Sequence, residues 1–240
     1  MKSVAIFQHT PIGTPGSVLP ILDSLGMAYE VIRIDQGQPV PESPDRYAGL
    51  IFMGGYMGVH DPLPWIAQEC RLIQQADAAD IPVSGHCLGS QLLAVALGGQ
   101  VAPNVRAEVG WHTINVDQDP TAHEWFGHKP GTELLTFQWH SDTFSIPENG
   151  LRIATNDNCR NQAFVVRDLH LGMQSHFEMT PSLVADYVER NGAFLKRQIE
   201  QGNPAVSSEA DLFTQVNERT LQLKDTLSQV YGRWVQGCKL

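Results

Sequence analysis

One cysteine of the chain lies where chemistry is expected. The segment 85–91 reads Gly-His-Cys-Leu-Gly-Ser-Gln and joins a short apolar run to an apolar helical pattern, which predicts a sharp strand-to-helix turn at Cys87. Its glycines let the two backbones approach closely. At a helix N-terminus, backbone N–H groups and the helix dipole favour a thiolate over a thiol. We therefore predict a nucleophile at Cys87, whereas Cys70, Cys159 and Cys238 are interpreted as inert.

A second segment offers the base that such a nucleophile needs. Residues 174–178 read Gln-Ser-His-Phe-Glu and follow a predicted strand over 171–173. In an extended segment, residues two positions apart point to the same side, so Glu178 can hold His176 in one tautomer. A nucleophile, a base and an orienting acid together make a catalytic triad. His86 is next to Cys87, but its side chain is expected to point away from it.

A third segment, 53–58, reads Met-Gly-Gly-Tyr-Met-Gly at the end of another apolar run. Glycines at this place let backbone N–H groups turn toward an oxyanion that develops beside Cys87. Taken alone, an ordinary glycine turn explains the segment equally well.

The first hundred residues alternate between strand-like and helix-like patterns. Strands are predicted over 3–9, 29–34, 49–53 and 81–84, and helices over 18–25, 64–79 and 88–97. Such alternation implies βαβ units and a mainly parallel sheet covered on both faces. The predicted fold class is therefore α/β, doubly wound and flavodoxin-like.

Closely spaced strand-like runs follow residue 100, over 100–102, 108–116, 134–139 and 151–155. The runs 162–167 and 170–175 are separated by a polar turn around Asp168, which predicts a hairpin. We interpret this half as additional antiparallel strands, with one last strand entering the centre of the sheet.

The C-terminal part is predicted to be helical. Thr180 and Pro181 begin a helix that should end near Asn191 and Gly192. After a loop over 201–208, the segment 211–235 repeats apolar residues every three or four positions, which indicates an amphipathic helix. We expect a domain over 1–200 and a helical extension over 201–240 packed on it, with a homodimer contact as the alternative.

Composition excludes several classes of protein. The 240 residues include 16 Lys+Arg and 26 Asp+Glu, a net charge of −10 that argues against nucleic-acid or anionic-membrane partners. No run approaches the ~20 apolar residues of a membrane helix, and the N-terminal run is too short for a signal peptide. The four cysteines are scattered, and pairs such as His60–Asp61 are isolated, so we expect no metal, no cofactor and a cytoplasmic location.

Together the three segments resemble the class I (triad) glutamine amidotransferase domain, in particular free-standing GMP-synthase-like members. The family motifs are G-x-C-x-G-x-Q and Q-x-H-P-E, and Phe177 replaces the usual proline of the second. The resemblance spans about residues 3–190 and includes the segments 108–111 and 139–142. The residues that match the two motifs are Gly85, Cys87, Gly89, Gln91, Gln174, His176 and Glu178.

The resemblance implies a reaction and a site. Cys87 would attack the side-chain amide of glutamine, and His176 would move protons while ammonia leaves a γ-glutamyl thioester that water hydrolyses. Backbone N–H groups of Gly55 and Leu88 would hold the oxyanion. The residues expected to face the substrate are Gly54, Gln91, His140 and Asp142. A charge-assisted bond from the substrate ammonium suits Asp142, although capping of a loop is the alternative.

Several alternatives remain open from the sequence. Since no ATP-binding glycine pattern is found, ammonia would go either to a separate synthetase subunit or to no partner, and the second case implies a γ-glutamyl peptide hydrolase. A catalytically silent binding or regulatory relative is favoured by Phe177 and the acidic C-terminal helix. An α/β-hydrolase with a cysteine nucleophile is disfavoured, because its acid normally precedes the histidine.

Overall fold

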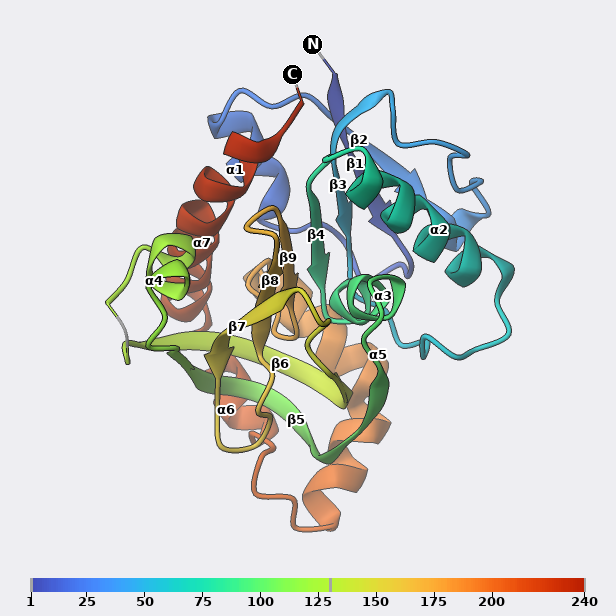
Figure 1. Ribbon diagram of the computed structural model, residues 1–240. Coiled ribbons are helices and arrows are strands. Elements are labelled where there is room, and N and C mark those ends of the chain that lie inside the picture. Colours follow the sequence, from blue (N-terminus) through green and yellow to red (C-terminus); the bar gives the residue numbers. More distant parts are fainter. Residues whose placement is uncertain (1, 130, 240) are drawn as a thin grey trace.

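A nine-stranded mixed sheet forms the centre of the computed structural model, which describes residues 2–129 and 131–239 (Figure 1). The strand order is β2-β1-β3-β4-β9-β8-β7-β5-β6. The strands are β1 (Ser3–Gln8), β2 (Tyr29–Arg33), β3 (Tyr47–Phe52), β4 (Val83–His86), β5 (Val101–Val116), β6 (Glu133–Phe144), β7 (Gly150–Thr155), β8 (Ala163–Val166) and β9 (His170–Met173).

Five neighbouring strands, β2, β1, β3, β4 and β9, are parallel. Every residue of β3, β4 and β9 is buried, because helices cover both faces of this half. This arrangement is the flavodoxin-like α/β fold that the alternating pattern predicted.

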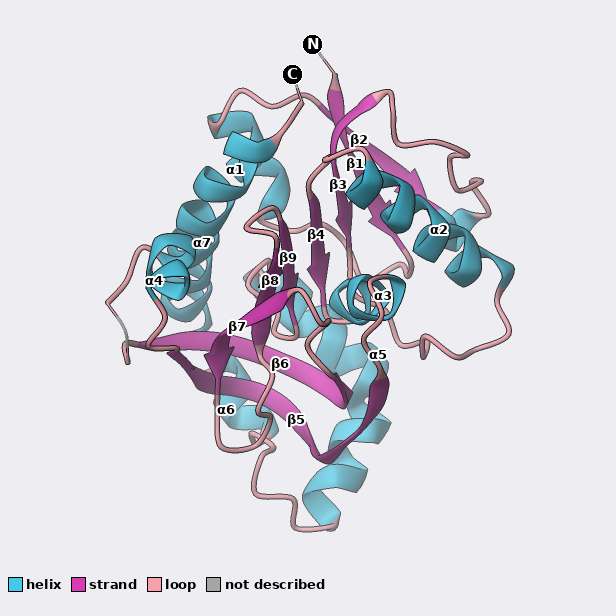
Figure 2. Cartoon of the chain, viewed as in Figure 1, coloured by secondary structure: helices cyan, strands magenta, loops and turns pink. Residues whose placement is uncertain are grey.

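The other half of the sheet is antiparallel (Figure 2). The predicted hairpin is confirmed, since β8 pairs antiparallel with β9, and β9 then lies beside β4 in the centre of the sheet. The runs 100–102 and 108–116 are not separate strands. They form the single strand β5, whose pairing register shifts between Pro103 and Glu108, and the exposed side chains of Val105 and Arg106 interrupt the strand pattern there.

The helices lie in two layers. In Figure 1, α2 (Pro64–Ala78) and α3 (Leu88–Ala96) cover one face of the parallel strands, and α1 (Val18–Ser24) and α7 (Val216–Trp234) lie on the other. Two apolar cores follow this division. The remaining helices are α4 (Pro120–Phe126), α5 (Pro181–Glu200) and α6 (Glu209–Phe213). Among the described residues, none of the helices has the length and apolar character required to cross a membrane.

The C-terminal helices differ from the sequence prediction. The predicted end of α5 near Asn191 is wrong, because the helix continues to Glu200 through a kink at Asn191 (φ −113°, ψ 15°). The single helix predicted over 211–235 is also wrong. It is divided into α6 and α7 by Gln215, whose left-handed backbone (φ 51°) no helix interior accepts. Helix α4, capped by the Asp119 side chain, was not predicted.

Candidate active site

Cys87 lies in the turn between β4 and α3. Its backbone has φ 49° and ψ −107°, a strained conformation for a non-glycine residue, and its N–H donates to the Met173 carbonyl at 2.8 Å. The predicted need for glycines is confirmed. A Cβ on Gly85 would lie 2.4 Å from the Gly89 carbonyl, and one on Gly89 would lie 2.0 Å from the Phe52 carbonyl oxygen. The turn therefore requires both glycines to bring strand and helix together.

His176 reaches the same edge of the sheet from β9. Because β4 and β9 are parallel neighbours, their carboxyl ends lie together, although 89 positions separate residue 176 from residue 87 (176 − 87). The His176 N–H donates to the Phe137 carbonyl at 2.8 Å, and its Nδ1 lies 2.6 Å from Glu178 Oε1. A Cβ on Gly54 would lie 2.8 Å from His176 Cε1 and 3.6 Å from Cys87 Cβ. The imidazole and the cysteine are thus both packed against Gly54.

The acid and the imidazole are held in their charged forms. Burial opposes charge on Glu178, but His176 and His86 outweigh it and hold the pKa of this carboxyl well below its ordinary value. Burial alone would lower the pKa of His176, yet the Glu178 carboxylate and the Cys87 sulfur outweigh it and raise the pKa of His176 to about 10. Nε2 of His176 is buried and meets no hydrogen-bond partner in the described part of the chain. This nitrogen is therefore free to exchange a proton with a reacting group.

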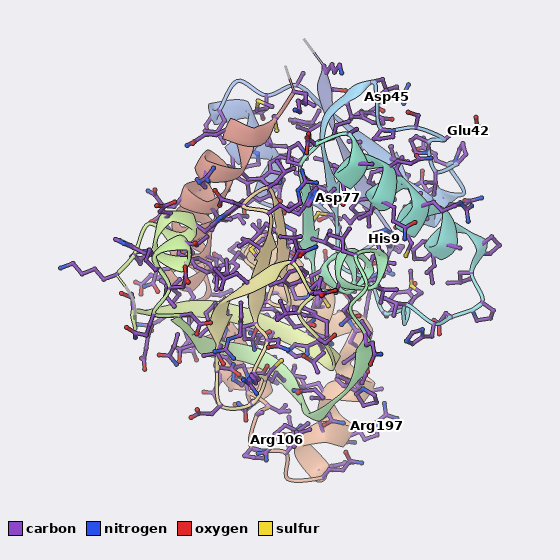
Figure 3. The ribbon with its side chains drawn as sticks, viewed as in Figure 1. His9, Glu42, Asp45, Asp77, Arg106 and Arg197 are labelled. Atoms are coloured by element: carbon purple, nitrogen blue, oxygen red, sulfur yellow. The ribbon has the colours of Figure 1, made fainter. Side chains whose placement is uncertain are left out.

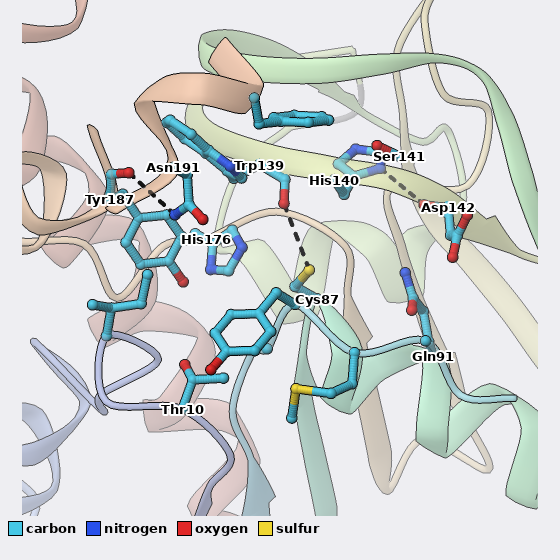
Figure 4. Close-up of a pocket in the computed structure, with 16 residues that line it drawn as sticks. Thr10, Cys87, Gln91, Trp139, His140, Ser141, Asp142, His176, Tyr187 and Asn191 are labelled. Atoms are coloured by element: carbon cyan, nitrogen blue, oxygen red, sulfur yellow. Dashed lines mark hydrogen bonds between the residues drawn. The ribbon is translucent and has the colours of Figure 1, made fainter. Parts of the chain in front are cut away.

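A pocket of about 300 Å³ opens onto these residues (Figure 4). The loops after β1 and β3 form one side, and β6 and α5 form the opposite side. The Cys87 sulfur lies on its floor, 4.0 Å from the Trp139 carbonyl oxygen. Three aromatic side chains, from Trp139, Tyr187 and Phe194, line the wall formed by β6 and α5.

The residues expected to face the substrate lie at or beside this pocket. Gln91, His140 and Asp142 line it, whereas Gly54 lies just behind the imidazole. The Gln91 amide is buried and donates to Gln174 Oε1 at 3.2 Å. The Asp142 carboxyl is partly exposed at the pocket, and the Asp142 carbonyl accepts a hydrogen bond from His140 Nδ1 at 2.9 Å.

Gly55 and Leu88, the expected oxyanion-binding residues, are neighbours. A Cβ on Gly55 would lie 2.9 Å from Leu88 Cδ2 and 3.4 Å from the Cβ of His9. His9, between α2 and the sheet (Figure 3), has Nδ1 2.9 Å from the Met53 carbonyl oxygen and Nε2 3.0 Å from Glu69 Oε2. The buried His9 side chain therefore holds the Met53 carbonyl, which leads into the glycine segment, in place. The sequence prediction missed this contact.

A further set of buried polar residues was missed behind Glu178. The second oxygen of Glu178 lies 2.8 Å from Nδ1 of His86, and Nε2 of His86 lies 2.9 Å from the Tyr231 hydroxyl. Ser84 and His86 alternate along the otherwise apolar β4, so they point to one face of the strand. That alternation of polar residues in a buried strand was the available signal.

Phe177, the departure from the family motif, is fully buried. Its ring packs in the apolar core, with its centroid 6.4 Å from that of Phe126. The segment that carries His176 and Glu178 is therefore anchored by an apolar side chain between them.

Within the described residues, Glu108, His140 and Cys159 form a group with the spacing of metal ligands, their ligand atoms lying within 4.8 Å of one another. The Glu108 oxygens already accept hydrogen bonds from the amides of Asn156 and Gln162, both at 2.7 Å, and His140 Nε2 lies 2.9 Å from Oε2. With both carboxylate oxygens engaged by donors, the group is a buried hydrogen-bond cluster, which we call the Glu108 cluster.

Comparison with known proteins identifies the class. The model of the family "Glutamine amidotransferase class-I" matches residues 17–194, so the chain belongs to this family. A crystal structure of a glutamine amidotransferase from Methylobacillus flagellatus superposes with a TM-score of 0.95 and is 36% identical, covering 100% of this chain and 96% of that one.

Curated relatives have more varied names. The glutamine amidotransferase-like protein YfeJ of Salmonella typhimurium is 25% identical over 94% of this chain and 97% of its own length. Gamma-glutamyl peptidase 4 of Arabidopsis thaliana is 25% identical over 80% of this chain and 79% of its own length. A glutamine-hydrolyzing GMP synthase subunit of Sulfolobus acidocaldarius is 29% identical over 67% of this chain and 82% of its own length. The family is shared, but these names describe different reactions.

Proposed function

We propose that this chain is a cysteine hydrolase that cleaves the side-chain amide of glutamine or of a related γ-glutamyl compound through a γ-glutamyl thioester. One observation carries the proposal. Cys87, in a strained turn at a helix N-terminus, lines the same pocket as His176, whose Nδ1 is held 2.6 Å from Glu178. Membership of the amidotransferase family supports the same assignment.

The proposed reaction assigns a role to each group. The Cys87 thiolate attacks the amide carbon, and the backbone N–H groups of Gly55 and Leu88 donate to the oxyanion. The His176 imidazolium gives its proton to the leaving nitrogen, so ammonia or an amine departs and a γ-glutamyl thioester remains. His176 then takes a proton from water, which attacks the thioester and releases glutamate and the Cys87 thiolate. Glu178 holds the imidazole in one tautomer throughout.

Substrate recognition is proposed for the β6 side of the pocket. Asp142 is a charge-assisted acceptor for the substrate's α-ammonium group, and Gln91 and His140 line the same pocket. The backbone of Gly54, behind the His176 imidazole, completes the proposed γ-glutamyl site. The proposed chemistry uses side chains and water and requires no cofactor.

The specific alternative is γ-glutamyl peptide hydrolysis, in which an amino acid or amine leaves instead of ammonia. The aromatic wall of Trp139, Tyr187 and Phe194 favours it, because such a surface stabilises a leaving group larger than ammonia. A relative carries the name of a γ-glutamyl peptidase. A silent binding or regulatory role is the third candidate.

Partners and placement belong to the proposal as well. A separate synthetase that consumes the ammonia fits a chain whose relatives include a glutamine-hydrolyzing subunit of GMP synthase. A homodimer contact and a cytoplasmic location are proposed from the sequence alone. We also propose an amidotransferase unit over 1–200, with residues 201–240 packed on it.

The test is incubation of the purified protein with glutamine and a panel of γ-glutamyl dipeptides, with acid quenching and mass spectrometry of the Cys87 peptide. We expect product release together with a γ-glutamyl adduct on Cys87. Faster release of ammonia from glutamine supports the glutaminase, and faster dipeptide cleavage supports the peptidase. If no compound is cleaved and a thiol probe labels Cys87 no faster than Cys159, the binding or regulatory role replaces both.

A further inference from the structure

A chain of buried hydrogen bonds extends from Glu178 away from the pocket. Its Oε1 faces His176, and its Oε2 lies 2.8 Å from His86 Nδ1 on β4. His86 Nε2 lies 2.9 Å from the Tyr231 hydroxyl, which lies 3.2 Å from Ser84 Oγ. Glu178 is 2% exposed, and the other three residues behind it are fully buried. Water therefore cannot replace a missing partner in this chain without a rearrangement.

The order of donors follows from the charges. An ionised Glu178 accepts at both oxygens, so His86 Nδ1 carries a proton and donates to Oε2. In a neutral imidazole, Nε2 then has a lone pair and accepts from the Tyr231 O–H. Burial raises the pKa of Tyr231 far above its ordinary value, so this phenol stays a donor. Ser84 in turn can donate to the Tyr231 oxygen. Every donor in the chain then points toward Glu178.

We propose that His86 and Tyr231 are positioning residues that fix Glu178, and through it the tautomer and charge of His176. The inference rests on the proposed function. Tyr231 belongs to α7, beyond the residues 17–194 that the family model matches. Its ring packs edge-on against Trp234 and lies parallel to that of His86, with centroids 6.1 Å apart. Helix α7 of the protein thus completes a site whose reacting groups, Cys87 and His176, follow β4 and β9.

The titratable groups that face this chain of hydrogen bonds lie on four different parts of the fold. On the pocket side, Tyr187 of α5 meets the His176 ring edge-on at 5.6 Å, and burial raises its pKa well above the ordinary value, so it stays neutral. The others are Cys87 at the start of α3, His86 on β4, and Tyr231 with Cys238 at the C-terminal end. Burial raises the pKa of Cys238 to about 12, so this thiol stays neutral near neutral pH and adds no charge beside Glu178.

The test uses the full chain and a readout that needs no substrate. Iodoacetamide alkylation of the Cys87 peptide is followed by mass spectrometry across the pH range in which the protein stays folded. Burial raises the pKa of Cys70 and Cys159 to about 11, so these thiols react slowly near neutral pH. In Tyr231→Phe, His86 Nε2 loses the hydroxyl that donates to it, so the imidazole of His86 is held less firmly against Glu178. Glu178 then holds the imidazolium of His176 less well, so less thiolate forms. We expect alkylation at neutral pH to slow about 3- to 10-fold, the effect of one buried hydrogen bond, with its midpoint moved to higher pH.

Two further comparisons separate positioning from general stability. Leu227→Ala truncates a fully buried side chain of the same helix and should lower the melting temperature without moving the alkylation midpoint. At position 86, Asn can still donate to Glu178 from the place of Nδ1, whereas Leu cannot. The midpoint of Cys87 alkylation should therefore lie at lower pH in His86→Asn than in His86→Leu. If His86→Leu fails to fold, Tyr231→Phe still tests the inference.

The outcomes distinguish this inference from the proposed function. A wild-type Cys87 that reacts only at alkaline pH would overturn the proposed function and this inference with it. A wild type with acid-shifted reactivity that Tyr231→Phe leaves unchanged would overturn the inference alone. Equal shifts in Tyr231→Phe and Leu227→Ala would also overturn it, because the effect would then belong to the packing of α7.

Discussion

Two buried carboxylates of this protein, Glu178 and Glu108, are each paired with a histidine, but the two histidines differ in what remains free. His176 contacts Glu178 through Nδ1, while its Nε2 meets no partner within the described residues and belongs to the pocket side. In His140, Nε2 faces Glu108 and Nδ1 faces the Asp142 carbonyl, both at 2.9 Å. An acid–histidine pair is therefore poised for proton transfer only where one ring nitrogen is left unengaged.

The cysteines beside the two pairs differ in the same way. Cys159, in the Glu108 cluster, lies 3.2 Å from the Thr143 hydroxyl, and burial raises the pKa of its thiol to about 11. Cys87 lies at a helix N-terminus, and its sulfur helps to raise the pKa of His176. Residue types alone do not separate the two clusters. Backbone position and unfilled hydrogen-bonding capacity do.

The largest expected effect is the loss of Cys87. Cys87→Ser and His176→Ala should each lower turnover about 10³-fold or more, because members of a triad act as a unit. Steady-state hydrolysis of the best γ-glutamyl substrate measures the loss, and circular dichroism checks the fold. Cys159→Ser is the matched control and should keep near-normal turnover. Near-normal hydrolysis in Cys87→Ser would contradict the proposed mechanism.

The second contrast is in pH dependence. Since the pKa of His176 is raised to about 10, its imidazolium should persist through neutral pH, and turnover should fall as pH rises through about 10. At neutral pH, Cys87 should alkylate about 10³-fold faster than Cys159, whose raised pKa leaves little thiolate. Equal alkylation rates at the two cysteines would remove the distinction between the clusters.

The same shifts affect stability, with opposite signs for acid and base. The raised pKa of His176 stabilises the fold fully below its ordinary pKa of about 6.5, and this contribution is lost as pH rises through about 10. The lowered pKa of Glu178 stabilises the fold above its ordinary pKa of about 4.3 and is lost as pH falls below it. Both contributions are complete between these ordinary values, where urea unfolding of the wild type should show more resistance than that of His176→Ala.

A smaller effect is expected from removing charge on the acids. Glu178→Gln should lower kcat about 10- to 100-fold, because an amide keeps the shape but not the charge that holds the imidazolium. Glu108→Gln should leave kcat within about threefold, raise KM through His140, and cost about 1–3 kcal/mol in urea unfolding. Equal losses of kcat in the two variants would show that Glu178 and Glu108 do not differ in their contribution to catalysis.

Much of this arrangement was predictable from local patterns. Segment 85–91 begins in the last residues of buried strand β4, and segment 174–178 directly follows buried strand β9. Strand ends of a parallel sheet share one edge, so the meeting of Cys87 and His176 at that edge could be predicted. The catalytic roles of these residues stay predictions until the variants are measured.

Other features could not be predicted because they depend on how distant elements pack. The amphipathic pattern of 216–234 identifies a buried face, but it does not reveal that Tyr231 reaches His86 across 145 positions. Likewise, His9 and Glu69 are ordinary polar residues in sequence and pair only because the fold brings α2 beside the residues that follow β1 and β3. The continuation of α5 past Asn191 was hidden by an Asn-Gly pair that usually ends a helix.

The pairing of β4 with β9 has an evolutionary consequence. Backbone bonds between these two strands hold the ends that carry Cys87 and His176, whereas β5 to β8 and α4 come from the chain between them, and β6 supplies part of the pocket wall. Mutations, insertions and deletions in that intervening segment can therefore reshape the wall and leave the spacing of sulfur and imidazole intact. A lineage could acquire new substrates by diversifying one half of the sheet while purifying selection preserves the other.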